Sequence, residues 1–178
     1  STIILLNFSL LTVLGTLLLI ATLMIKNKKI YPYFYGSSFT LLNFEIFNTL
    51  NLNIFDFFLN YLLPISLVSG VFSSMMIGHW FLVDPTISKE GMKKIAITST
   101  FQSLILTPLV FFEFIGQDIE SIFKNVILIL FLSTSILSFA SYKSLGEKSY
   151  TGVMASTGLS YLSLIVSLGA SGGLLLLS

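Results

Sequence analysis

Long apolar segments alternate with short polar ones along this 178-residue sequence. Each apolar segment is about twenty residues long, which is the length an α-helix needs to cross a hydrocarbon core of about 30 Å. The pattern predicts six helices, over residues 3–25, 33–50, 63–83, 94–116, 121–142 and 150–177. It therefore indicates an all-α protein, a polytopic transmembrane helical bundle that forms a single domain over residues 1–178.

Two segments between the first and third predicted spans are more polar. The predicted helix 33–50 carries six polar side chains, namely Ser37, Ser38, Thr40, Asn43, Glu45 and Asn48. Such a helix needs neighbouring helices around it, because lipid cannot satisfy its polar groups. Residues 52–61 place three polar side chains on one helical face, opposite mostly apolar ones, which predicts a short helix in the outer membrane interface.

The lysines indicate how the helices are oriented. Short cytoplasmic loops carry an excess of Lys and Arg. Six spans place Lys124 alone on one side of the membrane and the other eight lysines on the opposite side, namely Lys26, Lys28, Lys29, Lys89, Lys93, Lys94, Lys143 and Lys148. This distribution predicts that both termini are non-cytoplasmic.

Composition supports a membrane location and excludes several classes of function. Only 10% of the residues are charged, whereas a soluble domain is about a quarter charged. The net charge is +1 and the sequence contains no Arg, so the basic surface that binds nucleic acid is missing. The absence of Cys excludes thiol chemistry. We expect a multi-pass protein of a prokaryotic plasma membrane or of an organelle inner membrane.

Small residues recur at helical spacing in two of the predicted helices. In the segment 63–83 they are Ser66, Gly70, Ser74 and Gly78, and in the segment 150–177 they are Gly152, Ser156, Ser160, Ser163, Ser167 and Ser171. Small residues allow helix backbones to approach closely within a membrane. The stripes predict tight packing, and the second is also compatible with a polar pathway lined by hydroxyl groups.

Two carboxylates lie inside predicted helices, where ionisable groups are costly and are default candidates for function. Glu45 has Asn48 one turn further along, and Glu113 follows Gln102 and Pro108 in the fourth predicted helix. Pro108 also predicts a kink near the middle of that helix. The candidate ion, proton or ligand residues are therefore Glu45, Asn48, Gln102 and Glu113, with a hydrogen-bonded structural acid as the alternative.

The most concentrated polar element lies at the end of the third predicted helix. His79 is the only histidine and follows Met75 and Met76 by about one turn, while Asp84 and the proline after it predict a capped turn. A thioether with an imidazole suits Cu(I), and a single His leaves room for a haem b that is five-coordinate or shared with another chain. His79 and Trp80 are the cofactor-binding candidates. In the structural alternative, His79 hydrogen-bonds a neighbour and Trp80 anchors the interface.

No catalytic motif is present, neither a Gly-rich phosphate loop nor a His-Glu-x-x-His pair. We expect a membrane-embedded subunit of a larger respiratory or ion-translocating complex that is not catalytic by itself. It would supply packing surface and part of a proton, quinone or cofactor site. Its partners would be the lipid bilayer and other membrane subunits or copies of itself. The alternatives are a small self-sufficient oligomeric transporter or channel, and a haem-binding redox protein that uses His79.

Overall fold

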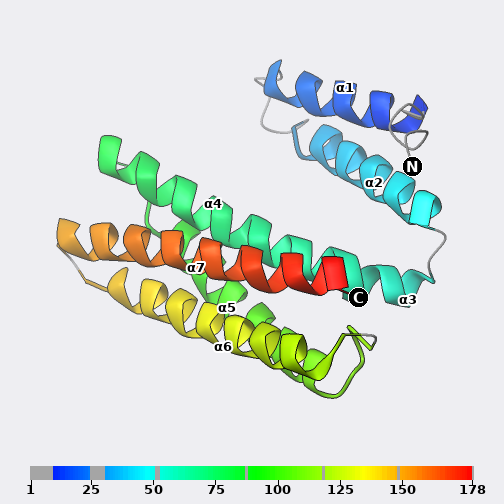
Figure 1. Cartoon of the computed structure of the whole chain (residues 1–178). Coiled ribbons are helices and arrows are strands. Elements are labelled where there is room, and N and C mark those ends of the chain that lie inside the picture. Colours follow the sequence, from blue (N-terminus) through cyan, green and yellow to red (C-terminus); the bar gives the residue numbers. More distant parts are fainter. Residues whose placement is uncertain are drawn as a thin grey trace. The chain divides into compact units, whose positions relative to one another are not determined.

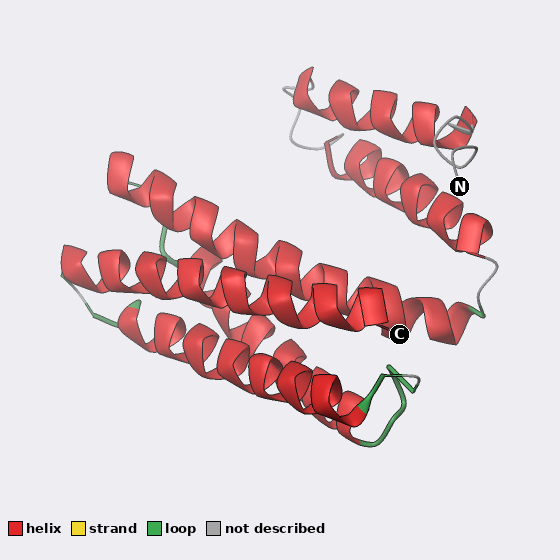
Figure 2. Cartoon of the chain, in the orientation of Figure 1, coloured by secondary structure: helices red, strands yellow, loops and turns green. Residues whose placement is uncertain are grey.

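The computed structural model describes residues 10–24, 31–50, 53–86, 88–117, 119–147 and 149–177. Within these ranges the backbone is almost entirely helical and contains no strand, which confirms the all-α class (Figure 2). The chain forms two compact units, Ser1–Phe57 and Phe58–Ser178, and each is described by itself. The single bundle over the whole chain stays a prediction.

The first unit contains α1 (Leu10–Met24), α2 (Tyr31–Leu50) and the short α3 (Ile54–Asp56). α1 and α2 pack closely at Gly15, whose carbonyl oxygen accepts a 2.7 Å hydrogen bond from the buried Ser38 hydroxyl. A Cβ atom at Gly15 would lie 2.8 Å from a methyl carbon of Leu42. This contact therefore requires a residue without a side chain. The predicted start of the first helix at residue 3 lies outside the described residues.

The second unit is a bundle of four helices, α4 (Leu63–Val83), α5 (Glu90–Phe111), α6 (Ser121–Ser144) and α7 (Tyr150–Leu177). Helices that follow one another are antiparallel neighbours, and α7 packs against α4 to close the ring (Figure 1). A large apolar cluster that includes Leu67, Leu106 and Phe131 fills one part of the interior. A smaller cluster with Met92 and Val153 fills the end beside the α4–α5 and α6–α7 loops.

Four helical segments are long and apolar enough to cross a membrane, among the residues that the structure describes. They are Ile54–Val83, Glu90–Phe111, Ser121–Ser144 and Tyr150–Leu177. These segments support a multi-pass membrane protein. The described part of α1 has 15 residues and is shorter than a span. The count of six spans and the orientation of the termini therefore stay predictions.

Ile54–Val83 is one continuous helical segment. The predicted interfacial helix over 52–61 is therefore helical from Ile54 and continues into α4, and its location in the membrane interface stays a prediction. Pro64 cannot donate a backbone hydrogen bond to the carbonyl of Asn60, and its ring would clash with that carbonyl in an α-helix. The helix continues through Pro64 because the preceding turn, Phe57–Leu62, is a wider π-helix.

α5 lies closer to the N-terminus than the predicted helix 94–116, since it begins at Glu90 and ends at Phe111. The negative charge of Glu90 in the first turn favours the earlier start, because it complements the helix dipole. Pro108 consequently lies in the last turn of the helix. The predicted kink or opened backbone group at this proline stays a prediction.

A Schellman motif ends α5 at Glu113, whose φ of 61° lies in the left-handed region. The Glu113 amide donates to the Val110 carbonyl over 3.2 Å, and the Phe114 amide donates to the Leu109 carbonyl over 2.9 Å. Glu113 therefore lies outside the helix, and its predicted position inside a membrane span is wrong.

The loops at the end of the bundle that carries Lys89 are tied together by hydrogen bonds. The Asp84 carboxylate accepts bonds from the amide and the hydroxyl of Thr86, over 3.0 and 2.7 Å, which confirms the predicted capped turn. These bonds lower the pKa of Asp84. The Tyr150 hydroxyl donates to the Leu82 carbonyl over 3.0 Å, so the start of α7 is fixed to the end of α4.

Gly78 and Gly158 provide a matched test of helix packing. A Cβ atom at Gly78 would collide with Thr157 and lie 2.9 Å from the Met92 side chain, whereas a Cβ at Gly158 would meet nothing within 4 Å. Alanine gains up to about 1 kcal/mol of helix propensity at either position, while overpacking costs about 1–3 kcal/mol. We expect Gly78→Ala to be less stable than Gly158→Ala by about 1–3 kcal/mol, measured by thermal unfolding in detergent. Equal melting temperatures would contradict this contact.

Candidate functional site

Hydroxyl side chains fill the middle of the α4–α7 bundle, around and between its two apolar clusters. Every buried polar side chain in the described part of this unit is a Ser or Thr: Ser74, Ser99, Thr100, Ser103, Thr134, Ser135, Ser138, Ser141, Ser156, Thr157, Ser160, Ser163, Ser167 and Ser171. These groups donate and accept hydrogen bonds but do not change charge near neutral pH. The interior is therefore polar without being titratable.

Hydroxyl groups of α6 bond directly to those of α7. The Ser141 oxygen lies 2.7 Å from that of Ser156 and 3.2 Å from that of Ser160. The Ser138 and Ser163 oxygens are 2.9 Å apart. The serine stripe predicted in the segment 150–177 thus faces the inside of the bundle, which confirms that it is a packing surface.

Other hydroxyls bond to backbone carbonyls of neighbouring helices. The Ser171 hydroxyl of α7 donates to the Pro64 carbonyl of α4 over 3.2 Å, and the Ser103 hydroxyl of α5 donates to the Phe131 carbonyl of α6 over 2.5 Å. Each of these bonds joins two helices in a region that water does not reach. They fix the rotation of each helix about its own axis.

A very small cavity of about 10 Å³ lies among these hydroxyls. All four helices contribute to its wall, which consists of Val71, Ser74, Ala96, Ser99, Ser138, Ser141, Ser160 and Ser163. A hydroxyl-lined space of this kind suits water rather than an apolar ligand. It also lacks a charged group that would offset the cost of removing an ion from water.

A larger groove of about 350 Å³ opens between α4 and α5. It is lined by Ser66, Gly70, Lys94, Ile95, Thr98, Ser99 and Gln102. Gln102 crosses the groove, since its amide donates to the Leu63 carbonyl over 2.8 Å and to the Ser66 hydroxyl. The structure thus places this predicted site residue against α4, where its amide hydrogens are already satisfied.

Ser99 lines both the cavity and the groove. A Cβ atom at Gly70 would lie 3.1 Å from the Ser99 oxygen. Because residue 70 has no side chain, the Ser99 hydroxyl forms part of the groove floor. These two residues therefore separate the open groove from the enclosed cavity.

Glu113 forms an ion pair with Lys124, with 2.6 Å between the carboxylate oxygen and the ammonium nitrogen. The hydrogen bond from Lys124, together with its positive charge, lowers the pKa of Glu113. The pair joins the loop after α5 to the first turn of α6. It stabilises a loop rather than a site inside the membrane.

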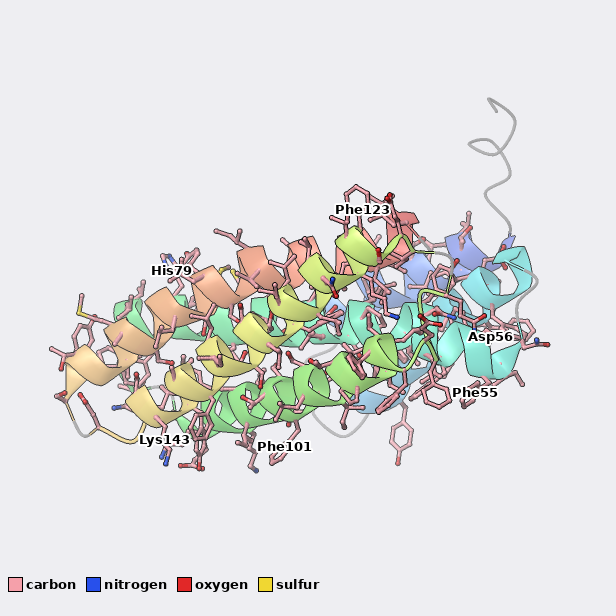
Figure 3. The ribbon with its side chains drawn as sticks, turned by 60° about the horizontal axis from the view of Figure 1, so that its bottom comes forward. Phe55, Asp56, His79, Phe101, Phe123 and Lys143 are labelled. Atoms are coloured by element: carbon pink, nitrogen blue, oxygen red, sulfur yellow. The ribbon has the colours of Figure 1, made fainter. Side chains whose placement is uncertain are left out.

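His79 and Trp80 lie on the outer surface of α4, and the side chain of His79 points away from the bundle (Figure 3). Trp80 is 59% exposed, whereas Met75 is only 6% exposed. Met75 therefore faces the interior, whereas Met76 is 37% exposed and lies one turn before the exposed His79. The copper hypothesis stays a prediction that concerns Met76 rather than Met75. The cofactor role of His79 and Trp80 stays a prediction.

Glu45 lies half-buried on α2, in the first unit. The side chain of Asn48 lies outside the described residues. The predicted pairing of these two residues as an ion, proton or ligand site therefore stays a prediction. Glu113 and Gln102, the other two candidates, have separate partners, because Glu113 pairs with Lys124 while Gln102 bonds to α4.

Sequence reasoning did not assign Lys94, Thr98 and Ser99 to a site. The run Thr98-Ser-Thr100, followed by Gln102 and Ser103, makes this part of α5 unusually polar for a membrane helix. That density of hydroxyl groups is the signal in the sequence. The register that turns Ser99 inward and Thr98 outward is visible only in the folded bundle.

No protein-family model matches this sequence, and neither a curated protein nor a solved structure matches it. The functional argument depends on the bundle itself. Its observations are the hydroxyl-lined interior, the groove between α4 and α5, and the character of each outer face.

Ser141 tests the hydroxyl interior, because one side chain bonds two serines of α7. Hydrogen bonds between membrane helices average about 0.6 kcal/mol and reach about 1.7 kcal/mol. We expect Ser141→Ala to lower the free energy of unfolding by about 1–2 kcal/mol, measured by equilibrium unfolding in mixed micelles. Ser133→Ala is the control, since Ser133 bonds only to Ile129 of its own helix. Equal losses in both variants would contradict the interhelical role.

The Glu113–Lys124 pair predicts a pH dependence. Because the folded-state pKa of Glu113 is lowered, its contribution to stability is present above the ordinary glutamate pKa and is lost as the pH falls through the lowered value. We expect the melting temperature of the protein to exceed that of Glu113→Gln at neutral pH, and this difference to shrink on acidification. The effect is small because the carboxylate is exposed. If the difference in melting temperature between the two proteins did not change with pH, the stabilisation would come from the loop backbone and not from the ion pair.

Proposed function

We propose that this chain is a membrane-embedded subunit of a larger complex and that the outer face of α4 is its docking surface for a second membrane helix. The assignment to a respiratory or ion-translocating complex extends the sequence argument. Four helices that are able to span a membrane support the location. The character of the α4 surface supports the docking role.

The observation that carries this proposal is a row of small polar residues on the outside of α4. Ser66, Ser69 and Ser73 are exposed on successive turns, and each hydroxyl bonds to a carbonyl of its own helix. Met76 and Trp80 continue the same face toward the end of the helix. Small residues in this arrangement let a second helix approach closely.

The outer surface of α4 also exposes large apolar side chains such as Ile65 and Phe72, but the row of exposed serines distinguishes it from α6 and α7. Their exposed side chains in the middle of each helix are mainly large and apolar, as at Ile129, Ile136 and Ile165. These surfaces suit lipid chains. The contrast between the faces supports a protein neighbour beside α4 and lipid beside α6 and α7.

The interior of the α4–α7 bundle gives less support to the two alternatives, a transporter or channel and a haem-binding redox protein. A path for ions through the bundle needs charged groups or a continuous polar channel, whereas the described core holds hydroxyls around a cavity of only about 10 Å³. A haem at His79 would lie at the edge of the outer α4 surface. Such a haem would be shared with the proposed neighbour, so its presence also depends on the complex.

Native mass spectrometry after mild detergent extraction tests the proposed function. We expect the chain to appear bound to at least one other membrane subunit. The double variant Ser69→Leu, Ser73→Leu should lose most of that partner, because bulky side chains prevent close approach. A native chain that is monomeric after gentle extraction would overturn the proposal.

The matched control is Ser133→Leu, which adds the same bulk to α6. It should keep the partner and show that leucine substitution alone does not disrupt the assembly. Thermal unfolding of each variant checks that the bundle remains folded. Equal loss of the partner in both variants would contradict an interface on α4.

A further inference from the structure

We propose that the groove between α4 and α5 binds one anionic phospholipid. Its phosphate would pair with the Lys94 ammonium group, and an ester carbonyl would accept a hydrogen bond from the Ser99 hydroxyl. The acyl chain would follow the groove past Ile95 and Gly70. Ser66 belongs to both the groove and the proposed docking row, whereas Ser69 and Ser73 do not line the groove. Variants at Ser69 and Ser73 therefore test the docking surface separately from the lipid site.

Lys94 is the charged side chain that lines the groove. Its neighbour Lys93 pairs with Glu90 at 3.6 Å. Lys89 donates to the Glu147 carbonyl over 3.3 Å and lies above the Phe81 ring. Lys94 is exposed and lines the groove, and it has no ion-pair partner within the described part of the chain. It therefore attracts an anion from outside the protein.

Ser99 supplies the second, independent observation. Its side chain is only 2% exposed and lines the groove. Every other serine named on the cavity wall has a hydrogen bond to a neighbouring hydroxyl. Ser99 donates to no acceptor among the described residues. No fully enclosed side-chain oxygen or nitrogen lacks a partner in the described part of the chain, so the Ser99 oxygen is reached from the open groove. An acceptor that enters the groove gains a bond that the protein leaves unmade.

The order of these groups along α5 matches the order of groups in a phospholipid. Lys94 lies in the second turn of the helix, and Ser99 lies five residues deeper, about 7.5 Å along the axis at 1.5 Å per residue. A phospholipid presents a phosphate first, then ester carbonyls, then hydrocarbon. Gly70 leaves the Ser99 hydroxyl accessible from the groove, since any side chain there would cover it.

The location of Lys94 favours an anionic headgroup. Lys89, Lys93 and Lys143 lie at the same end of the bundle, which is the end that the lysine pattern predicts to be cytoplasmic. Anionic lipids concentrate in the cytoplasmic leaflet, and one lysine near the surface contributes about 1 kcal/mol to their attraction. The groove volume of about 350 Å³ accommodates part of one lipid.

The test titrates the full-length protein in non-ionic detergent with phosphatidylglycerol or with phosphatidylcholine and counts bound lipids by native mass spectrometry. We expect a single tight site that prefers phosphatidylglycerol. Lys94→Gln should weaken phosphatidylglycerol binding about fivefold, the equivalent of about 1 kcal/mol, with little effect on phosphatidylcholine. Ser99→Ala should weaken binding of both lipids, because both have ester carbonyls.

Lys143→Gln is the matched control, since Lys143 lies at the same end of the bundle but stacks over the Phe139 ring. It should bind phosphatidylglycerol like the native chain. Equal losses in the two lysine variants, or equal affinity for the two lipids, would overturn the proposal. Displacement of the lipid by millimolar inorganic phosphate would show a simple anion site and would also overturn it.

Discussion

Hydrogen bonds between hydroxyl groups of neighbouring helices are the interaction on which the α4–α7 bundle depends. Lipid chains are as apolar as leucine side chains, so burial of apolar surface gives membrane helices little reason to associate. The serines of α7 meet those of α6 at 2.7–3.2 Å. Bonds from Ser103 and Ser171 to carbonyls of the adjacent helices extend the same interaction. The apolar clusters fill the space that these bonds leave.

This way of packing also determines where ligands are able to bind. Small side chains bring the helices close together, so the cavity among them is only about 10 Å³ and its wall is uncharged. Larger openings occur where two helices diverge at the surface, as between α4 and α5. Binding at the side of the bundle, to lipid or to a neighbouring helix, is the mode that such an architecture favours.

Local backbone chemistry explains the two main differences between the predicted and observed helices. Apolar residues continue past Phe111, so hydropathy extends the helix, but the left-handed conformation of Glu113 and two backbone hydrogen bonds end it. At Pro64 the opposite occurs, because a π-helical turn lets the helix pass through a residue that normally begins one. Hydropathy measures preference for lipid, and it is insensitive to both effects.

The sequence by itself determined the all-α class and the packing role of the serine stripes. It also gave the bounds of α6 and α7 to within two residues. These features follow from length, apolarity and helical spacing, which are local properties of the chain. The sequence also singled out Gln102, but as a candidate ion, proton or ligand residue. Only the tertiary structure decided that Gln102 bonds to α4, that Ser99 lies at the floor of a groove, and that His79 faces outward. Those facts depend on the rotation of each helix against its neighbours, and contacts between residues far apart in the chain determine that rotation.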